Sequence, residues 1–301
     1  MVYTPHTEPE RQRMLDTIGV ERLDDLFADI PTRHRYPDLD LPDAVTEPEI
    51  VRELRALSET NLTTEQTPTF LGAGAYRHWV PSVVDHVIRR GEFATAYTPY
   101  QAEVSQGTLQ AIFEYQSLIC DLTGMDVANA SHYDGATAAA EAVVQAYNVF
   151  RGKRRRVLVA PTLHPHYRAA IRTYVQGMDL ELLGDDREPD TPLSALVEEV
   201  NEETACVIVQ SPNFLGQVET LDTLKEAIAA RDTRTLLAVV TNPLSLGLFK
   251  PPGAYGADIV LGEGQPLGLG LNYGGPYLGF YATRDRNVRQ VSGRLVGKTV
   301  D

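Results

Sequence analysis

The chain has 301 residues, which is enough for one large α/β domain or two smaller domains with a hydrophobic core. Its formal net charge of −14 argues against a nucleic-acid-binding surface, and its 43% hydrophobic content is typical of a soluble globular protein. No segment approaches the roughly 20 consecutive apolar residues of a membrane span, and the first residues contain no apolar core of a signal peptide. We therefore expect a cytoplasmic protein that binds neither membranes nor nucleic acids.

The basic residues comprise 23 arginines and 4 lysines, beside 41 acidic residues. A surface poor in lysine and rich in acidic residues indicates adaptation to high salt, a hypothesis that stability measurements can test. The two cysteines, Cys120 and Cys206, lie far apart in apolar runs and are expected to be reduced residues of the core.

Residues 1–65 are expected to form a helical N-terminal segment, followed by a second domain over residues 66–301. Short helices are predicted at 9–19, where Gly19 ends the helix, and at 47–59, where apolar residues recur at helical spacing.

The next part of the chain consists mostly of loops and one long helix. That helix is predicted to begin at Glu103 or Ser105 and to end near Gly124, since apolar residues recur along it at intervals of three and four.

From residue 135 onward, helices and strands alternate. Helices are predicted at 136–151, 164–176, 192–202 and 221–231, and strands at 156–160, 179–183, 205–210, 236–241, 257–261 and 277–282. Because the strands are nearly all apolar, this alternation predicts an α/β fold with a mostly parallel sheet covered by helices on both faces. The last residues contain no capping pattern, so we expect a fragment of a longer chain.

Common cofactor and metal motifs are missing or incomplete. The glycines of residues 262–268 are spaced one residue too far for a dinucleotide-binding G-x-G-x-x-G, and the loop comes late in the chain. No Walker A, C-x-x-C, H-E-x-x-H or G-x-S-x-G sequence occurs. His164-Pro165-His166 has no carboxylate or cysteine spaced to complete a ligand set. We interpret it as a helix start and expect no metal.

The stretch ADIVLGEGQPLGLGLNYGGP, residues 257–276, is an apolar strand that runs into a glycine-rich loop. Glycines gather where a backbone turns sharply or approaches another group closely. The stretch contains no Lys, Cys, His or Ser, and its ionisable side chains are Asp258, Glu263 and Tyr273. It has the composition of a ligand-holding loop without a reactive side chain.

Residues 130–142, ASHYDGATAAAEA, place small and polar residues directly before a helix. Ser131, Asp134, Gly135 and Thr137 could form an anion site at the helix N-terminus. Asp134 as an ordinary N-cap explains the same residue types, and on residue types alone we favour the cap.

Residues 95–107, TAYTPYQAEVSQG, form a loop that Pro99 stiffens. Tyr97 and Tyr100 are followed by polar side chains, which is a composition suited to a small polar ligand. The tyrosines could equally pack beneath the loop, and the residues alone favour neither interpretation.

Residues 70–84, FLGAGAYRHWVPSVV, place Gly72 and Gly74 before a cluster of aromatic residues that includes Tyr76 and Trp79. Such a cluster suits either an interface or a pocket wall.

Taken together and in this order, four stretches carry a family resemblance. FLGAGAY-x-H-x-x-P, TAYTPYQ-x-E-x-SQGTLQ, GMDVANAS-x-YDGATAAAEA and GEGQ-x-LG…GGPYLGF resemble the P-protein of the glycine cleavage system, the pyridoxal-phosphate-dependent glycine decarboxylase. The chain is similar, along essentially its whole length, to the first subunit of the two-subunit form. The resemblance implies the type I fold of pyridoxal-phosphate enzymes, with a large domain and a C-terminal small domain that this chain lacks.

The resemblance also implies where a cofactor-binding lysine would stand. In this fold a lysine just past a late strand of the large domain holds the cofactor as a Schiff base. Counting from Asp258, as in the catalytic partner subunit, puts Gln265 at the position of a histidine and Pro266 at the position of the lysine. Proline has no amine, so the resemblance implies that the partner subunit, rather than this chain, binds pyridoxal phosphate covalently.

A second departure from the family pattern concerns the pyridine nitrogen of the cofactor. An Asp at the end of the preceding strand normally keeps this nitrogen protonated. Here the strand LLAVVT ends in Thr241-Asn242-Pro243, with no carboxylate. The chain is therefore identified as the non-catalytic paralogue.

The partners implied by the resemblance are glycine dehydrogenase subunit 2, in an α2β2 assembly, and the lipoyl H-protein, which receives the aminomethyl group after glycine is decarboxylated. The side chains expected to reach the partner's active site are Tyr97, Tyr100, Gln101, Glu103 and Ser105. The residues expected to form a vestigial cofactor loop are Ser131, Asp134, Gly135 and Thr137.

Two other functions remain open. The chain could be a self-sufficient pyridoxal-phosphate enzyme that uses Lys250, although the LFKPPG context favours an exposed turn lysine. It could also be a purely scaffolding or regulatory subunit.

Overall fold

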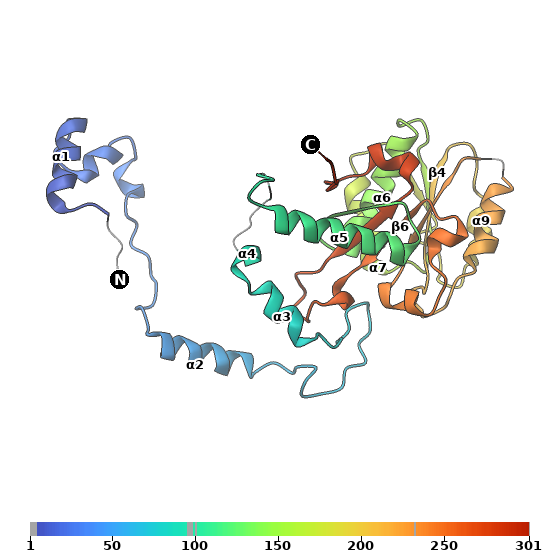
Figure 1. The fold of residues 1–301 in the computed structure, drawn as a ribbon, viewed down its shortest axis with the longest axis horizontal. Helices are drawn as coiled ribbons and strands as arrows, with labels where there is room; N and C mark the ends of the chain where they lie inside the picture. Colours follow the sequence, from blue (N-terminus) through green and yellow to red (C-terminus); the bar gives the residue numbers. More distant parts are fainter. Residues whose placement is uncertain (1–4, 95–98, 100, 232, 301) are drawn as a thin grey trace. The chain divides into compact units, whose positions relative to one another are not determined.

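A computed structural model describes residues 5–94, 99, 101–231 and 233–300 of the chain (Figure 1). The chain divides into two compact units, Met1–Thr67 and Pro68–Asp301. No helix among the described residues is both long and apolar enough to cross a membrane.

The first unit contains two α-helices, α1 (Glu8–Ile18) and α2 (Glu47–Ser58). Each begins with a threonine N-cap and a glutamate three residues later, which together form a capping box. Helix α1 ends at Gly19, whose φ of 87° is the left-handed conformation that glycine adopts without steric cost. Both predicted helices are confirmed. Two short 3₁₀ helices, Leu23–Phe27 and Thr32–His34, lie between them.

The second unit is built on a seven-stranded sheet in the order β1-β7-β6-β5-β4-β2-β3. The strands are β1 (Val127–His132), β2 (Arg156–Val159), β3 (Glu181–Leu183), β4 (Thr204–Gln210), β5 (Leu236–Val240), β6 (Ile259–Glu263) and β7 (Gly279–Thr283). Strands β2 to β6 pair in parallel, whereas β7 is antiparallel to both β1 and β6. The predicted mostly parallel sheet is confirmed.

The sequence pattern did not predict strand β1. Its sequence, VANASH, is rich in residues of low strand propensity. Pairing with β7 along one edge nevertheless holds it in the sheet, and Ala128 and Asn129 are buried there. Tertiary pairing therefore overrides local preference in this strand.

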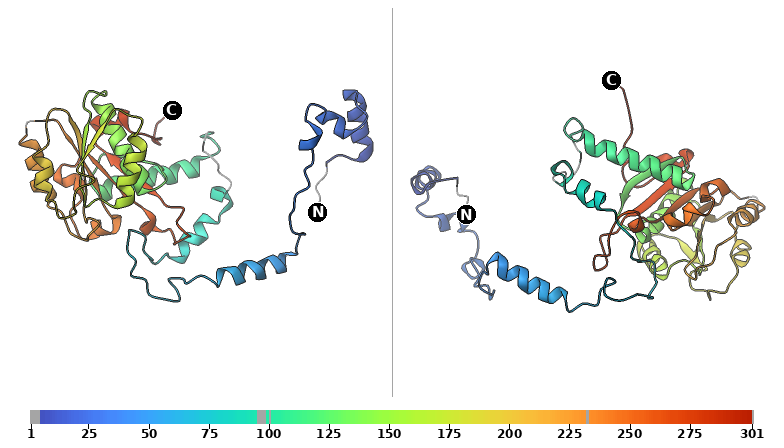
Figure 2. Two further views of the ribbon diagram at one scale, coloured as in Figure 1. Left: turned by 180° about the vertical axis from the view of Figure 1, so that it is seen from behind. Right: turned by 60° about the horizontal axis from the view of Figure 1, so that its bottom comes forward.

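The second unit contains seven α-helices among its described residues, and α5 to α9 cover the two faces of the sheet (Figures 1 and 2). The seven helices are α3 (Ser82–Ile88), α4 (Gly91–Ala94), α5 (Gln106–Thr123), α6 (Gly135–Val149), α7 (Pro165–Val175), α8 (Leu193–Val197) and α9 (Leu221–Ala229). Helices α6 and α7 contribute to the core on one face, and α5, α8 and α9 contribute to the core on the other. Strand β5 shows the expected period of two, since Ala238 faces the first core while Leu237 and Val239 face the second.

Helix α8 is shorter than the predicted helix at 192–202. The chain turns at Asn201, whose side-chain oxygen accepts hydrogen bonds from the backbone of Glu203 and the hydroxyl of Thr204. Such local side-chain bonds compete with helical hydrogen bonding and end the helix early.

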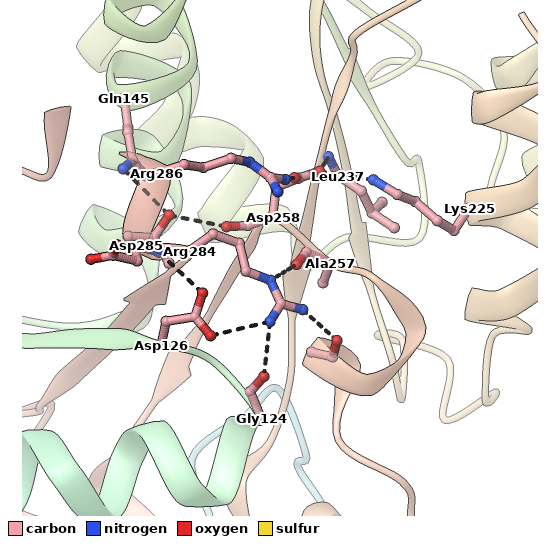
Figure 3. A network of polar contacts seen from close by, with 12 residues as sticks. Gly124, Asp126, Gln145, Lys225, Leu237, Ala257, Asp258, Arg284, Asp285 and Arg286 are labelled. Atoms are coloured by element: carbon pink, nitrogen blue, oxygen red, sulfur yellow. Dashed lines mark hydrogen bonds and ion pairs between the residues drawn. The ribbon is translucent and has the colours of Figure 1, made fainter. Parts of the chain in front are cut away.

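A buried polar network ties the amino end of β6 to its neighbours (Figure 3). The side chain of Asp258 is 3% exposed and accepts hydrogen bonds from the backbone of Leu237 at 3.0 Å and from Lys225 Nζ at 2.9 Å. Arg286 forms a second ion pair with the same carboxylate. Beside it, Arg284 donates to the carbonyl oxygen of Ala257 at 2.9 Å. This network lies at the end of the strand opposite to its carboxyl end.

Candidate functional site: a cavity at the carboxyl ends of the parallel strands

A cavity of about 440 Å³ opens at the carboxyl ends of β4, β5 and β6, where Gln210, Thr241 and Glu263 form part of its wall. Crevices at this edge of an open parallel sheet are where α/β proteins bind ligands. The other lining residues are Gly74, Tyr76, His164, Tyr167, Pro212, Asn213, Phe214, Gly216, Val240, Asn242, Leu244, Ser245 and Pro266.

His164 forms an aromatic wall of the cavity at the start of α7. Its Nδ1 accepts a hydrogen bond from the backbone N–H of His166 at 3.1 Å, and its Nε2 lies 2.8 Å from the carbonyl oxygen of Ala73. These contacts require a neutral ring with the proton on Nε2. Burial lowers the pKa of His164, which favours the same neutral form. The ring packs edge-on against Phe214, with a centroid distance of 4.8 Å.

The glycine–aromatic stretch at 70–84 contributes part of this wall. Gly74 and Tyr76 line the cavity. Trp79 does not line it and is 85% exposed. The pocket-wall interpretation therefore holds for the first part of the stretch but not for its tryptophan.

Pro266, which the resemblance puts at the position of the lysine, lies buried in the cavity wall. None of the described residues that line the cavity is a lysine. Lys225 is engaged with Asp258 at the opposite end of β6. The ammonium of Lys250 lies 4.4 Å from the ring centroid of Tyr255, outside the cavity lining.

The end of β5 offers no carboxylate to a pyridine nitrogen. The hydroxyl of Thr241 lies 3.3 Å from that of Ser245. The side-chain oxygen of Asn242 accepts a hydrogen bond from the backbone of Leu244 at 3.0 Å. Both side chains serve the turn after the strand, so this part of the cavity does not fit a protonated pyridine ring.

Helix α6 begins next to Glu263, a residue of the cavity lining, and Asp134 is its N-cap. The carboxylate of Asp134 accepts a hydrogen bond from the backbone N–H of Thr137 at 2.7 Å, and the Thr137 hydroxyl accepts one from the backbone of Asp134. The N-cap interpretation of these residues is confirmed. Ser131 lies apart from this cap, because its hydroxyl bonds to the backbone of Arg294.

Glu263, the last residue of β6, places its carboxylate against the start of α6. One oxygen accepts a hydrogen bond from the backbone N–H of Gly135 at 2.9 Å, and the other accepts from Gln265 and Leu278, each at 3.0 Å. Burial raises the pKa of Glu263 and the Asp134 carboxylate adds to this, while the three backbone N–H groups act in the opposite direction.

The contact between Glu263 and α6 was not predicted from the sequence. The only local signal is a single carboxylate between two glycines, directly after an apolar strand. Tyr167 was missed as well. It lines the cavity next to Glu263, and burial raises the pKa of its phenol well above the usual range.

The tyrosine loop is covered only in part. Tyr97 and Tyr100 lie outside the described residues. Gln101, Glu103 and Ser105 are described, and none of them lines this cavity. Ser105 is the N-cap residue of α5. The expected contacts of these five side chains with a partner stay a prediction.

No group of three or more potential metal-ligating side chains occurs in the described part of the chain. His164 and His166 flank Pro165 at the first turn of α7, as the helix-start interpretation predicts.

The sheet, its helices and the cavity at its carboxyl edge define an α/β protein with the type I fold of pyridoxal-phosphate enzymes. A solved structure of sphingosine-1-phosphate lyase from Burkholderia pseudomallei shares this fold, with a TM-score of 0.60 and 13% identity over 87% of this chain and 64% of that one.

The chain belongs to the glycine cleavage system P-protein family, whose family model matches residues 1–301. A solved structure titled glycine decarboxylase (P-protein) of the glycine cleavage system, in inhibitor-bound form, is 49% identical, with a TM-score of 0.87. That match covers 100% of this chain and 67% of the other.

Two curated relatives are both named probable glycine dehydrogenase (decarboxylating) subunit 1. The protein of Thermomicrobium roseum is 52% identical, over 100% of this chain and 67% of its own length. The protein of Geobacillus kaustophilus is 50% identical, over 99% of this chain and 66% of its own length. The chain thus spans about two thirds of the length of these relatives.

Proposed function

We propose that this chain acts as the subunit without a cofactor-binding lysine in a heteromeric glycine dehydrogenase (decarboxylating). Together with a lysine-bearing subunit 2 it would decarboxylate glycine and transfer the aminomethyl group to the lipoyl H-protein. The names of its relatives support the enzyme and the subunit. The expected α2β2 composition follows from the same resemblance.

The single observation that carries the proposal is Pro266 in the wall of the cavity. A covalent bond to the aldehyde of pyridoxal phosphate requires a primary amine, and no lysine is among the described residues of the lining. Lys225 and Lys250 are both placed elsewhere, by an ion pair and by a cation–π contact. These placements disfavour the alternative of a self-sufficient enzyme that uses Lys250.

The end of β5 also lacks the carboxylate that the pyridine nitrogen of the cofactor would need. The end of β5 offers Thr241 and Asn242 in place of a carboxylate, and both side chains are hydrogen-bonded within their own turn. The cavity of this chain therefore does not fit pyridoxal phosphate. In the proposed assembly the partner subunit holds the cofactor.

The contribution of this chain would be to complete and close the partner's active site. A reaction that passes through a carbanion needs a pocket from which water is excluded. We assign this role to the loop that carries Tyr97 and Tyr100, with Gln101, Glu103 and Ser105 beside it. Loss of such positioning contacts lowers catalytic rates by large factors.

The test is co-expression with the lysine-bearing subunit 2, followed by a glycine–CO2 exchange assay. The chain alone should show no turnover and no borohydride-reducible adduct with pyridoxal phosphate, and the co-purified complex should show both. A reducible adduct on this chain alone, placed at Lys250 by peptide mapping, would overturn the proposal.

Substitution of the loop separates an active-site role from pure scaffolding. Tyr97→Phe and Tyr100→Phe should lower the exchange rate of the assembled complex by about tenfold or more without preventing assembly. The matched control is Tyr174→Phe, because Tyr174 is a partly exposed tyrosine of helix α7 that does not line the cavity. Unchanged exchange in both loop variants would favour a scaffolding subunit.

A further inference from the structure

Three backbone N–H groups converge on one carboxylate at the edge of the cavity. They belong to Gly135 at the first position of α6, to Gln265 in the loop after β6, and to Leu278 before β7. All three donate to Glu263, at 2.9 to 3.0 Å. Both carboxylate oxygens accept hydrogen bonds, so the group fills the position as an anion would.

These donors together form an anion-binding arrangement. The N-terminus of a helix carries a partial positive charge, and its first N–H groups are not used within the helix. Converging backbone N–H groups from neighbouring loops add to this effect. Phosphate groups bind readily at helix N-termini of this kind.

The packing of the main chain holds Glu263 close to α6. A Cβ atom added to Gly135 would lie 2.9 Å from the backbone nitrogen of Glu263 and would clash with the hydroxyl of Tyr167. At Gly279, on the neighbouring strand, an added Cβ would overlap the carbonyl oxygen of Asp134. Only glycine permits this approach, so the carboxylate is held in position by packed backbone rather than by a mobile loop.

We propose that Glu263 is an internal anion that occupies the N-terminus of α6 and thereby excludes phosphate and phosphorylated ligands from the cavity. A phosphate would have to displace a carboxylate bound by three hydrogen bonds, and it would meet that negative charge within the same cavity. This determinant is separate from the lysine replaced by Pro266. The exclusion of phosphate by Glu263 concerns only the cavity of this chain, so it does not depend on which partner completes the assembly.

The direct test measures binding of inorganic phosphate by isothermal titration calorimetry. The unsubstituted chain should show no saturable binding. Glu263→Ala removes the carboxylate and frees its three donors, so saturable phosphate binding should appear, at an affinity about tenfold or more above the detection limit. Glu263→Asp keeps a negative charge near the donors and should resemble the unsubstituted chain.

A control variant separates this effect from a general change of charge. Glu226→Ala removes one carboxylate from the exposed surface of α9 and should leave phosphate binding undetected. Saturable phosphate binding by the unsubstituted chain would overturn the proposal, and so would the absence of any gain in Glu263→Ala.

A second measurement uses the unsubstituted chain, so it does not depend on the folding of a variant. Phosphate should leave the amide NMR signals of Gly135, Gln265 and Leu278 unchanged up to tens of millimolar, because Glu263 keeps these groups bonded. A saturable shift of these three signals would mean that phosphate replaces the carboxylate, and would contradict the inference. Neither experiment measures decarboxylation. A result that overturns the inference about Glu263 is therefore distinct from a result that overturns the proposed function.

Discussion

Gly135 is the residue at which the start of α6 and the end of β6 come into contact. Gly135→Ala would place a methyl group 2.9 Å from the backbone nitrogen of Glu263, and a backbone atom cannot move away as a flexible side chain can. Overpacking of this kind destabilises proteins by about 1–3 kcal/mol, so we expect a loss in that range. The measurement is chemical denaturation at neutral pH.

The matched control for that substitution is Gly177→Ala. An added Cβ at Gly177 has nothing within 4 Å, and the residue is exposed after α7. The free energy of unfolding of Gly177→Ala should differ from that of the unsubstituted chain by less than about 0.5 kcal/mol. Equal losses in the two variants would show that the tight contact at Gly135 carries no special cost.

His164 should make stability depend on pH. Its pKa is lowered from the usual 6.5, chiefly by burial, so the unfolded chain takes up a proton at a higher pH than the folded chain. The stabilisation by the neutral ring is therefore complete above about pH 6.5 and is lost as the pH falls through the folded value. Each unit of difference between the two pKa values corresponds to about 1.4 kcal/mol.

The measurement is the free energy of unfolding at pH 8 and at pH 5.5, for the unsubstituted chain and for His164→Asn. Asn is chosen because it can still cap α7 but does not titrate. The variant should lose less stability on acidification. His166→Gln, at the exposed neighbouring position, should behave like the unsubstituted chain. A steeper pH dependence in His164→Asn would contradict the assignment of a neutral, buried ring.

At the scale of the element, the first turn of α6 depends on one side chain. Asp134→Ala removes the acceptor for the backbone N–H of Thr137, and loss of an N-cap costs about 0.5–2 kcal/mol. Asp134→Asn keeps an acceptor and should recover most of that stability. The measurement is the midpoint temperature of thermal unfolding. Equal midpoints in Asp134→Ala and Asp134→Asn would mean that the cap is not important for the helix.

The helices and strands that carry clear local sequence signals were predicted, and those that depend on distant contacts were not. Helices α1 and α2 carry capping boxes that their sequences show directly, and both were predicted within a residue or two. Strand β1 was missed because Ala128 and Asn129 favour no strand by themselves and are buried only through pairing with β7. Helix α8 was overestimated because the competing turn at Asn201 was not recognised.

At the scale of the whole molecule, the network around Asp258 joins α9, β5, β6 and the segment after β7 (Figure 3). Asp258→Ala would leave the buried N–H of Leu237 without its carboxylate acceptor, which costs about 1–3 kcal/mol. Lys225→Met should cost less, because Arg286 still pairs with the carboxylate. Asp126→Ala is the control, since Asp126 is half-exposed and lies 3.6 Å from Arg284. A larger loss in Asp126→Ala than in Asp258→Ala would contradict this ranking.

The net charge of −14 leads to a prediction about the whole surface. Repulsion between like charges weakens as salt shortens the range of electrostatic forces, from about 10 Å at 0.1 M to about 3 Å at 1 M. We expect the free energy of unfolding to rise between these salt concentrations. The measurement is urea denaturation in potassium chloride, and equal stability at both concentrations would remove the support for adaptation to high salt.

The sequence by itself determined the alternation of helices and strands and the family resemblance, which implies that Pro266 stands at the position of the lysine. Each of these features can be recognised from residues that are close together in the sequence, because the hydrophobic period, the capping residues and the motif spacing each extend over only a few residues. The cavity itself could be anticipated from the same patterns, since the carboxyl ends of parallel strands meet at one edge of the sheet.

Only the tertiary structure decided what fills the start of α6. The bond from Gly135 to Glu263 joins residues 128 positions apart, and neither residue carries a local signal for the other. The contact between His164 Nε2 and the carbonyl oxygen of Ala73 is of the same kind, since the two residues are 91 positions apart. Such contacts depend on how the sheet brings distant segments together. A loop that looked like an empty cofactor site in the sequence therefore contains its own anion in the folded chain.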